Sequence, residues 1–167
     1  MPTKQNHNLS HSATVHPEPP NHTHAPSSTS LEQLPFFELG LIPEICERVA
    51  KIGYTIPTPI QREAIPLILE GHDAIGIAQT GTGKTAAFML PLIDSLLCSP
   101  KAKNKQQPRV LVLAPTRELA TQNFEATVSF AQGTKLRAVV VFGGVGQRPQ
   151  EREIEKGCDI LIATPGR

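Results

Sequence analysis

The stretch that decides the fold runs from Ala78 to Thr85 and reads Ala-Gln-Thr-Gly-Thr-Gly-Lys-Thr. A short apolar segment from Ala74 to Ala78 precedes it, and we expect this segment to be a strand. The segment from Lys84 to Leu97 has the apolar spacing of a helix. A glycine-rich turn between a strand and a helix is the phosphate-loop arrangement, with Ala78 where the stricter pattern has glycine.

The residue types in this loop predict a site for a nucleoside triphosphate. Gly81 and Gly83 lack a Cβ, so the backbone can turn tightly and approach phosphates closely. Successive backbone N–H groups and the N-terminus of the helix then face the anion. Lys84 supplies a positive charge for the β- and γ-phosphates, and the Thr85 hydroxyl is a natural ligand for Mg²⁺. We expect Lys84 and Thr85 to act in catalysis and the whole loop to contact the nucleotide: Ala78, Gln79, Thr80, Gly81, Thr82, Gly83, Lys84 and Thr85.

The alternative for this loop is an ordinary glycine-rich turn, which the strand before it and the helix after it disfavour. The rest of the chain supports the same class of fold. Apolar spacing predicts helices over residues 42–52, 61–70, 117–131 and 149–156, and strands over residues 110–114, 138–142 and 160–163. This alternation predicts an α/β fold with a mainly parallel sheet flanked by helices. The strand at 110–114 is apolar throughout, so we expect it to be buried on both faces.

The first 34 residues differ in composition from the rest. They are rich in His, Pro, Ser and Thr and poor in large apolar side chains, so we expect a disordered tail before a folded domain at residues 35–167. A metal-binding tract is the alternative, but a solvated polar tail is favoured because no Cys or carboxylate cluster completes a set of ligands. Five of the six histidines lie in this tail: His7, His11, His16, His22 and His24.

Charge and cysteine content narrow the class of protein. The formal net charge is +1, so any contact with nucleic acid must come from a few placed groups and not from a basic surface. The cysteines Cys46, Cys98 and Cys158 show no metal or disulfide spacing, so we expect inert thiols and a cytoplasmic location. We also expect neither a membrane-spanning helix nor a secretory signal.

Four further segments complete a series with the phosphate loop. Gly53 to Gln61 reads Gly-Tyr-Thr-Ile-Pro-Thr-Pro-Ile-Gln, and the other three follow expected strands. In this order and approximate spacing, the chain from residue 35 onward resembles the first half of the N-terminal RecA-like domain of the DEAD-box RNA helicases. Those three segments are Pro115-Thr116-Arg117-Glu118-Leu119, Gly143-Gly144 and Thr164-Pro165-Gly166-Arg167.

The resemblance implies ATP as the nucleotide and gives roles to two residues before the loop. Gln61 ends a segment similar to the family's Q motif and would read the adenine edge, since an amide offers both a donor and an acceptor. Phe36 would stack on the adenine ring. Two alternatives stay open: Phe36 as a core aromatic that exchanges roles with Phe37, and Gln61 as a surface helix residue.

The resemblance also implies RNA as a partner, gripped mainly through its backbone and therefore largely without sequence preference. Helix capping by Thr116 and a flexible turn at the glycine pair are the alternatives. Lys101, Lys103 and Lys105 would add phosphate contacts or, more simply, form a solvated loop face. Within the family, Val140 to Val145 is similar to the bacterial RhlE-like group. The RNA-contacting residues implied are Thr116, Arg117, Gly143, Gly144, Thr164 and Arg167.

The family's Asp-Glu-Ala-Asp sequence, which holds Mg²⁺ and positions the attacking water, is not among the 167 residues. We therefore expect part of a longer helicase that couples ATP hydrolysis to RNA unwinding, with negligible ATPase activity of its own. We also expect an open apolar edge at the phosphate-loop strand and poor solubility. A non-catalytic module that binds nucleotide or RNA is the alternative. An unrelated phosphate-loop enzyme, such as a small kinase or a DNA translocase, would leave Gln61 and Arg117 unexplained.

Overall fold

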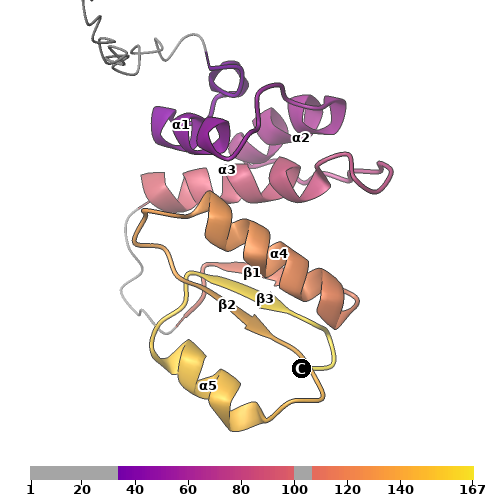
Figure 1. Ribbon diagram of the computed structural model, residues 1–167, viewed down its shortest axis with the longest axis vertical. Helices are drawn as coiled ribbons and strands as arrows, with labels where there is room; N and C mark the ends of the chain where they lie inside the picture. The colour runs from indigo at the N-terminus through magenta and orange to yellow at the C-terminus, as the bar shows by residue number, and fades with distance from the viewer. Residues whose placement is uncertain (1–33, 100–106) are drawn as a thin grey trace, which may run out of the picture.

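The computed structural model describes residues 34–99 and 107–167 (Figure 1). The predicted tail with its five histidines, together with Lys101, Lys103 and Lys105, lies outside these residues. The described elements, in chain order, are η2 (Phe37–Leu39), α1 (Pro43–Lys51), α2 (Pro59–Leu69), α3 (Lys84–Cys98), β1 (Val110–Leu113), α4 (Arg117–Phe130), β2 (Ala138–Val141), α5 (Gln147–Glu155) and β3 (Ile160–Ala163).

The sheet of the described residues has three parallel strands in the order β1-β3-β2, which confirms the predicted α/β class. Leu113 lies opposite Ala163, and Ala163 lies opposite Val141. The three strands therefore end level with one another. The segments that follow them emerge at one edge of the sheet, where ligands gather in folds of this class.

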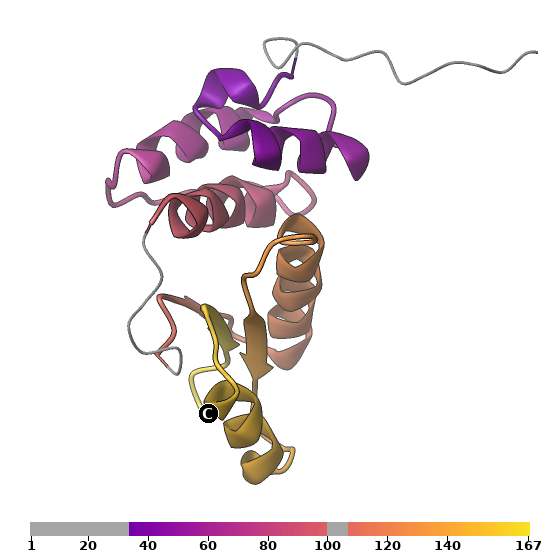
Figure 2. The same ribbon diagram turned by 90° about the vertical axis from the view of Figure 1, so that its left-hand side faces the viewer.

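Helices cover both faces of the sheet. Figures 1 and 2 show α4 on one face, α5 on the other, and α1, α2 and α3 as a further layer beyond α4. The main core lies between the sheet, α4 and this helical layer, because the apolar faces of these elements can leave water only by packing on one another. Its buried members include Ile45, Ile65, Met89, Leu90, Ile93, Ala120, Phe130, Ile160 and Ile162.

The strand predicted from Ala74 to Ala78 is wrong. These residues have no regular secondary structure, and Ile75 and Ile77 are 93% and 92% exposed. In Figure 1 this segment joins α2 to α3, apart from the three strands. A strand forms only where a neighbour satisfies its backbone N–H and C=O groups, and none of the three described strands pairs with this segment.

The prediction that β1 is buried on both faces is also wrong. Val112 is 9% exposed, whereas Leu111 and Leu113, which point to the opposite face, are each 59% exposed. Among the described strands β1 pairs only with β3, so it is an edge strand. The open apolar edge that we expected at the phosphate-loop segment therefore lies at β1 in the sheet that the structure describes.

Candidate functional site

The loop from Gln79 to Gly83 turns tightly into α3. Gly81 and Gly83 have φ angles of 80° and 84°, a left-handed conformation that other residues adopt only with strain. The Thr82 hydroxyl donates a 2.8 Å hydrogen bond to the Gln79 carbonyl and closes the turn. The helix begins at Lys84, directly after the loop, so the N–H groups of its first turn are available to an anion.

Lys84 folds back beneath this loop. Its Nζ donates hydrogen bonds to the carbonyl oxygens of Ala78 at 2.5 Å and Gln79 at 2.6 Å. An ammonium group has three hydrogens, so these two bonds leave one donor for an anionic ligand. The charge predicted for the phosphates is therefore fixed at the loop by the loop's own backbone.

Gln61 braces the phosphate loop from α2. Its Nε2 donates to the Gly83 carbonyl at 3.2 Å, and its Oε1 accepts from the Thr58 backbone N–H at 2.9 Å. Gln61 is only 1% exposed. The structure thus places Gln61 against the phosphate loop and excludes the alternative of a surface helix residue, but both ends of its amide bond to backbone groups of Thr58 and Gly83. The two backbone bonds hold the start of α2 against the start of α3.

The structure does not support the prediction that Phe36 stacks on adenine. Phe36 is 1% exposed and packs edge-to-face on Tyr54, with ring centroids 6.3 Å apart. Tyr54 in turn packs edge-to-face on Phe130 of α4. The ring of Phe36 is used in the core, because burying an aromatic ring removes a large apolar surface from water. The adjacent Phe37 is 37% exposed, so it has ring surface available for a ligand.

Thr85 makes a contact that sequence reasoning missed. Its Oγ1 donates to Oδ1 of Asn123, on α4, at 3.2 Å. The two residues are 38 positions apart, so no local pattern reveals the pair. The contact joins the phosphate loop to the helix that begins at Thr116 and Arg117.

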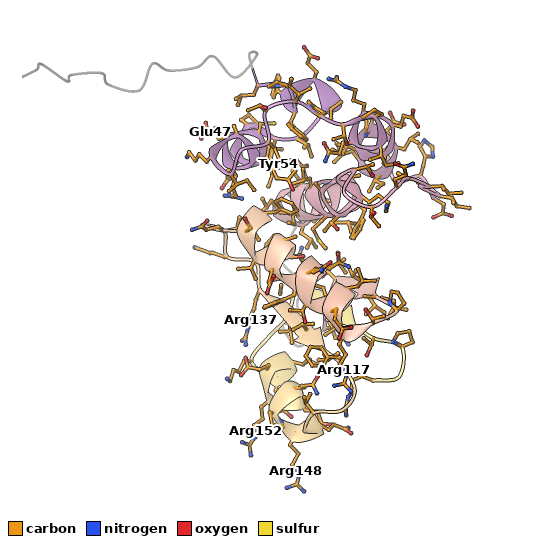
Figure 3. The ribbon with its side chains drawn as sticks, turned by 45° about the vertical axis from the view of Figure 1, so that its right-hand side comes forward. Glu47, Tyr54, Arg117, Arg137, Arg148 and Arg152 are labelled. Atoms are coloured by element: carbon orange, nitrogen blue, oxygen red, sulfur yellow. The ribbon has the colours of Figure 1, made fainter. Side chains whose placement is uncertain are left out.

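The edge of the sheet carries the segments expected to contact RNA. Thr116 caps α4, and its side chain accepts from the Leu119 N–H at 3.3 Å. Arg117 lies at the start of α4, on the side of the molecule that carries α5 (Figure 3). A Cβ placed on Gly144 would come within 1.9 Å of the Arg117 guanidinium. Arg117 and Gly144 thus lie in direct contact.

Arg167 supports the loop that follows β2. Its guanidinium donates to the Phe142 carbonyl at 3.3 Å, the Val145 carbonyl at 2.9 Å and the Gln147 side chain at 3.2 Å. The Thr164 backbone N–H bonds to the Val141 carbonyl at 3.1 Å. The residues expected to contact RNA therefore converge from three strand ends. Arg167 holds the loop after β2 in place and is itself exposed.

Residues 58–167 match the family model described as DEAD/DEAH box helicase. The chain belongs to the DEAD/DEAH box helicase family. It is 47% identical over 132 residues to probable ATP-dependent RNA helicase DDX23 of Homo sapiens, covering 77% of this chain and 16% of that protein. DEAD-box ATP-dependent RNA helicase 20 of Arabidopsis thaliana is 44% identical over 132 residues, covering 79% of this chain and 26% of that protein.

Among solved structures, this DEAD-box chain resembles the RNA helicase Prp28 from Chaetomium thermophilum bound to ADP. The TM-score is 0.70 at 42% identity, over 78% of this chain and 32% of that one. The likeness confirms the RecA-like helicase fold that the motif series predicted. The chain spans about a sixth to a third of these relatives.

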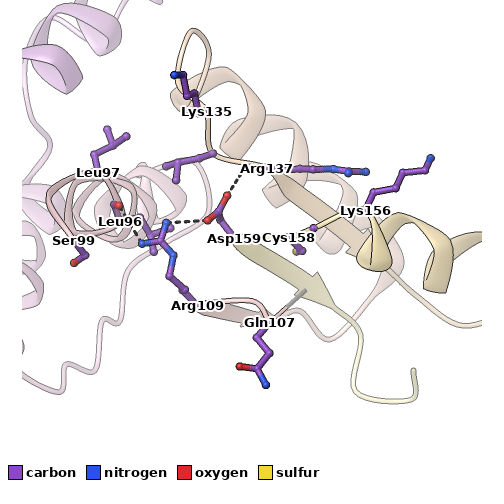
Figure 4. Close-up of a pocket in the computed structure, with 12 residues that line it drawn as sticks. Leu96, Leu97, Ser99, Gln107, Arg109, Lys135, Arg137, Lys156, Cys158 and Asp159 are labelled. Carbon is purple, nitrogen blue, oxygen red and sulfur yellow. Dashed lines mark hydrogen bonds and ion pairs between the residues drawn. The ribbon is translucent and has the colours of Figure 1, made fainter. Parts of the chain in front are cut away.

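In the described part of the DEAD-box chain, a cavity lies far from these motifs, at the opposite ends of the strands (Figure 4). Its volume is about 470 Å³. Arg109 donates to Asp159 at 2.8 Å and to the Leu96 carbonyl at 3.2 Å, and Asp159 also accepts from the Arg137 N–H at 3.0 Å. These bonds join the starts of all three strands to the end of α3, so we assign the ion pair a structural role.

The remaining site predictions concern thiols, metals and membranes. Burial raises the pKa of Cys46 and of Cys158 to about 11, so both stay protonated at neutral pH. Within residues 34–99 and 107–167, no group of three or more His, Cys, Asp or Glu side chains is placed to hold a metal ion. None of the helices in that part of the chain is long and apolar enough to cross a membrane.

Proposed function

We propose that this chain is the ATP-binding and RNA-binding part of an ATP-dependent RNA helicase whose complete form couples ATP hydrolysis to RNA unwinding. The observation that carries the proposal is the phosphate loop. Two left-handed glycines shape it, the Lys84 ammonium is fixed beneath it, and Gln61 braces it from α2. The relatives named above are described as ATP-dependent RNA helicases, which supports the same activity.

Mg²⁺ is the cation proposed to accompany ATP. The Thr85 hydroxyl donates its hydrogen bond to Asn123, which leaves oxygen lone pairs for a hard cation. Such a cation usually keeps several waters and takes further ligands from phosphates, so a single protein oxygen at the loop fits. When bound, Mg²⁺ would neutralise charge on the phosphate groups. Lys84 and Thr85 are the residues that we propose act directly on them.

The RNA is proposed to lie across the carboxyl ends of β1, β2 and β3. Arg117 is exposed there, and nothing lies within 4 Å of a Cβ added to Gly143, which leaves space for a backbone to approach. Contacts of this kind are to phosphates and sugars, so they fix register without reading bases. We propose Thr116, Arg117, Gly143, Gly144, Thr164 and Arg167 as the residues of this surface.

Three finer points of the proposal rest on the sequence. The first is membership of the RhlE-like group, which rests on the segment from Val140 to Val145. The others are a folded domain over residues 35–167 after a disordered tail, and a cytoplasmic location. The relatives described above come from a human, a plant and a fungus, so they lend no weight to a bacterial group.

The alternative for the 167-residue polypeptide is a module that binds nucleotide or RNA without hydrolysing ATP. RNA-stimulated phosphate release that Lys84→Ala abolishes would overturn this alternative and support hydrolysis by the chain itself.

Calorimetry with Mg·ATP and Mg·GTP tests the binding proposal. We expect the chain to prefer ATP, and Lys84→Ala to lose most affinity for both nucleotides. Lys51→Ala, which changes an exposed lysine of α1, is the matched control and should bind as the parent does. Gln61→Ala should lose adenine preference, with its fold checked by circular dichroism. Absence of Mg·ATP binding by the folded parent chain would contradict the proposal.

A further inference from the structure

We propose that Asn123 is a positioning residue that holds the Thr85 hydroxyl in the orientation that Mg²⁺ requires. This inference rests on the proposed function, because it presupposes that the phosphate loop binds a Mg²⁺–nucleotide. It adds a residue of α4 to a site otherwise built from the loop, α2 and α3.

The geometry places Asn123 on the buried face of α4. Ala120 and Thr127, one turn before and after it, are each 0% exposed. Residues three and four apart share one face of a helix, so Asn123 points the same way. The pairing with Thr85 spans the contact between α3 and α4, which pack together along this face.

The Thr85 hydroxyl, in the first turn of α3, bonds outside its own helix. The hydroxyls of Ser95 in α3 and Thr127 in α4 donate to carbonyls four residues earlier in their own helices, at 2.8 Å and 2.6 Å. That is the ordinary local partner of a helical hydroxyl. Thr85 instead donates across to the other helix, to Oδ1 of Asn123.

The chemical consequence follows from the single proton of a hydroxyl. A hydroxyl has one hydrogen and two lone pairs, and only a lone pair can bind a cation. The hydrogen bond to Asn123 fixes the direction of the Thr85 O–H bond. The two lone pairs of the same oxygen are then fixed in the remaining directions. Partners that orient a metal-binding group in this way commonly contribute ~10–100-fold to metal affinity.

The test is ADP binding by calorimetry, in EDTA and across a Mg²⁺ titration, on the full 167-residue chain. Asn123→Leu keeps the approximate size and removes the acceptor. We expect its ADP affinity in EDTA to be unchanged and its half-saturating Mg²⁺ concentration to rise ~10-fold or more. Gln122→Leu, the exposed neighbour on α4, is the matched control and should titrate as the parent does.

Two further variants separate positioning from packing. Asn123→Asp retains an acceptor and should keep the Mg²⁺ dependence, whereas Thr85→Val should lose it as Asn123→Leu does. In the Thr85→Val background, Asn123→Leu should add nothing, because the shared interaction is already gone. The same double-mutant cycle separates the two roles if Asn123→Leu alone folds poorly. A packing defect would have its full effect in the Thr85→Val background as well, whereas loss of the shared hydrogen bond would not.

The outcomes distinguish this inference from the proposed function. If the parent chain shows no Mg²⁺-dependent ADP binding, the proposed function fails. If the parent shows it and Asn123→Leu matches the parent, or if Asn123→Asp loses it as fully as Asn123→Leu, the positioning role of Asn123 is overturned.

Discussion

Single residues set the shape of the phosphate loop, and Gly83 is constrained twice. Its φ angle of 84° is left-handed, and an added Cβ would lie 2.4 Å from Nε2 of Gln61. The strain alone costs about 1–2 kcal/mol in other residues. The contact is a separate cost, because it would push the Gln61 amide off the loop.

Gly83→Ala is therefore expected to lower ATP affinity by at least about 10-fold, equivalent to about 1.4 kcal/mol. Gly71→Ala is a matched control: φ is 83° there, but nothing lies within 4 Å of an added Cβ. It should lower the melting temperature and leave ATP affinity unchanged. Equal losses of ATP affinity in both variants, measured by calorimetry, would show that strain and not Gln61 is responsible.

Asp94 makes stability depend on pH. Burial raises the pKa of this carboxyl above its ordinary value of 3.8, although Oδ2 accepts the Ile42 N–H at 2.7 Å. A raised folded pKa means that the charged form is disfavoured in the folded state. The resulting destabilisation is complete above the folded pKa and disappears as the pH falls toward 3.8.

Asp94→Asn keeps an oxygen acceptor for Ile42 and removes the charge. We expect this variant to be more stable than the parent at neutral pH, with the advantage shrinking as the pH falls toward 3.8. Urea unfolding across a pH series measures the difference. Asp73→Asn, at an exposed position, reports the general effect of removing one negative charge. An advantage that stayed constant with pH would contradict the assignment to Asp94.

The amino-acid sequence predicted the residues of the phosphate loop better than it predicted the residues that pack around the loop. Lys84, Gly81 and Gly83 have roles that follow from backbone geometry and charge within one short stretch, so the sequence was sufficient. Asn123 became visible only once two helices were packed together. Phe36 and Phe37 are adjacent and chemically identical, so only burial distinguishes the core ring from the exposed one.

At the scale of elements, α4 connects the two halves of the candidate site. Its N-terminus carries Thr116 and Arg117 at the sheet edge, and its middle carries Asn123 against the phosphate loop. Arg117 lies so close to Gly144 that the start of α4 and the loop after β2 act as one surface.

Gly144→Ala is expected to destabilise the chain. The left-handed φ of 81° contributes about 1–2 kcal/mol, and the exposed Arg117 guanidinium has to move aside, which adds a smaller cost. Arg117→Ala should relieve the second part when combined with Gly144→Ala. Gly143→Ala is the control, since nothing lies within 4 Å of its added Cβ and its φ is not positive. Urea unfolding measures all four variants, and strictly additive effects of Arg117→Ala and Gly144→Ala would exclude the contact.

Helices were easier to predict than strands for a physical reason. The bounds of α1 to α5 differ from the predicted ones by no more than two residues, because helical hydrogen bonds are local. A strand depends on its neighbours. The strands β1, β2 and β3 have partners, whereas the equally apolar segment from Ala74 to Ala78 has none among the described strands.

At the scale of the whole molecule, the chain exposes apolar side chains on two segments that were expected to be strands, one of them buried on both faces. Ile75 and Ile77 are 93% and 92% exposed, and Leu111 and Leu113 on the edge strand β1 are each 59% exposed. An apolar edge strand with unpaired backbone groups is a template for pairing with another chain. We therefore expect the 167-residue chain to self-associate as its concentration rises.

Changing the exposed side chains should reduce this association without weakening the core. Leu111→Thr with Leu113→Thr puts β-branched residues, which suit a strand, in place of apolar surface. We expect the double variant to shift the chain toward monomer in sedimentation experiments. Val112→Thr, on the buried face of the same strand, is the matched control and should lower the melting temperature instead. A parent chain that stays monomeric at all concentrations and unfolds cooperatively would contradict this prediction, because the exposed face of β1 would then need no cover.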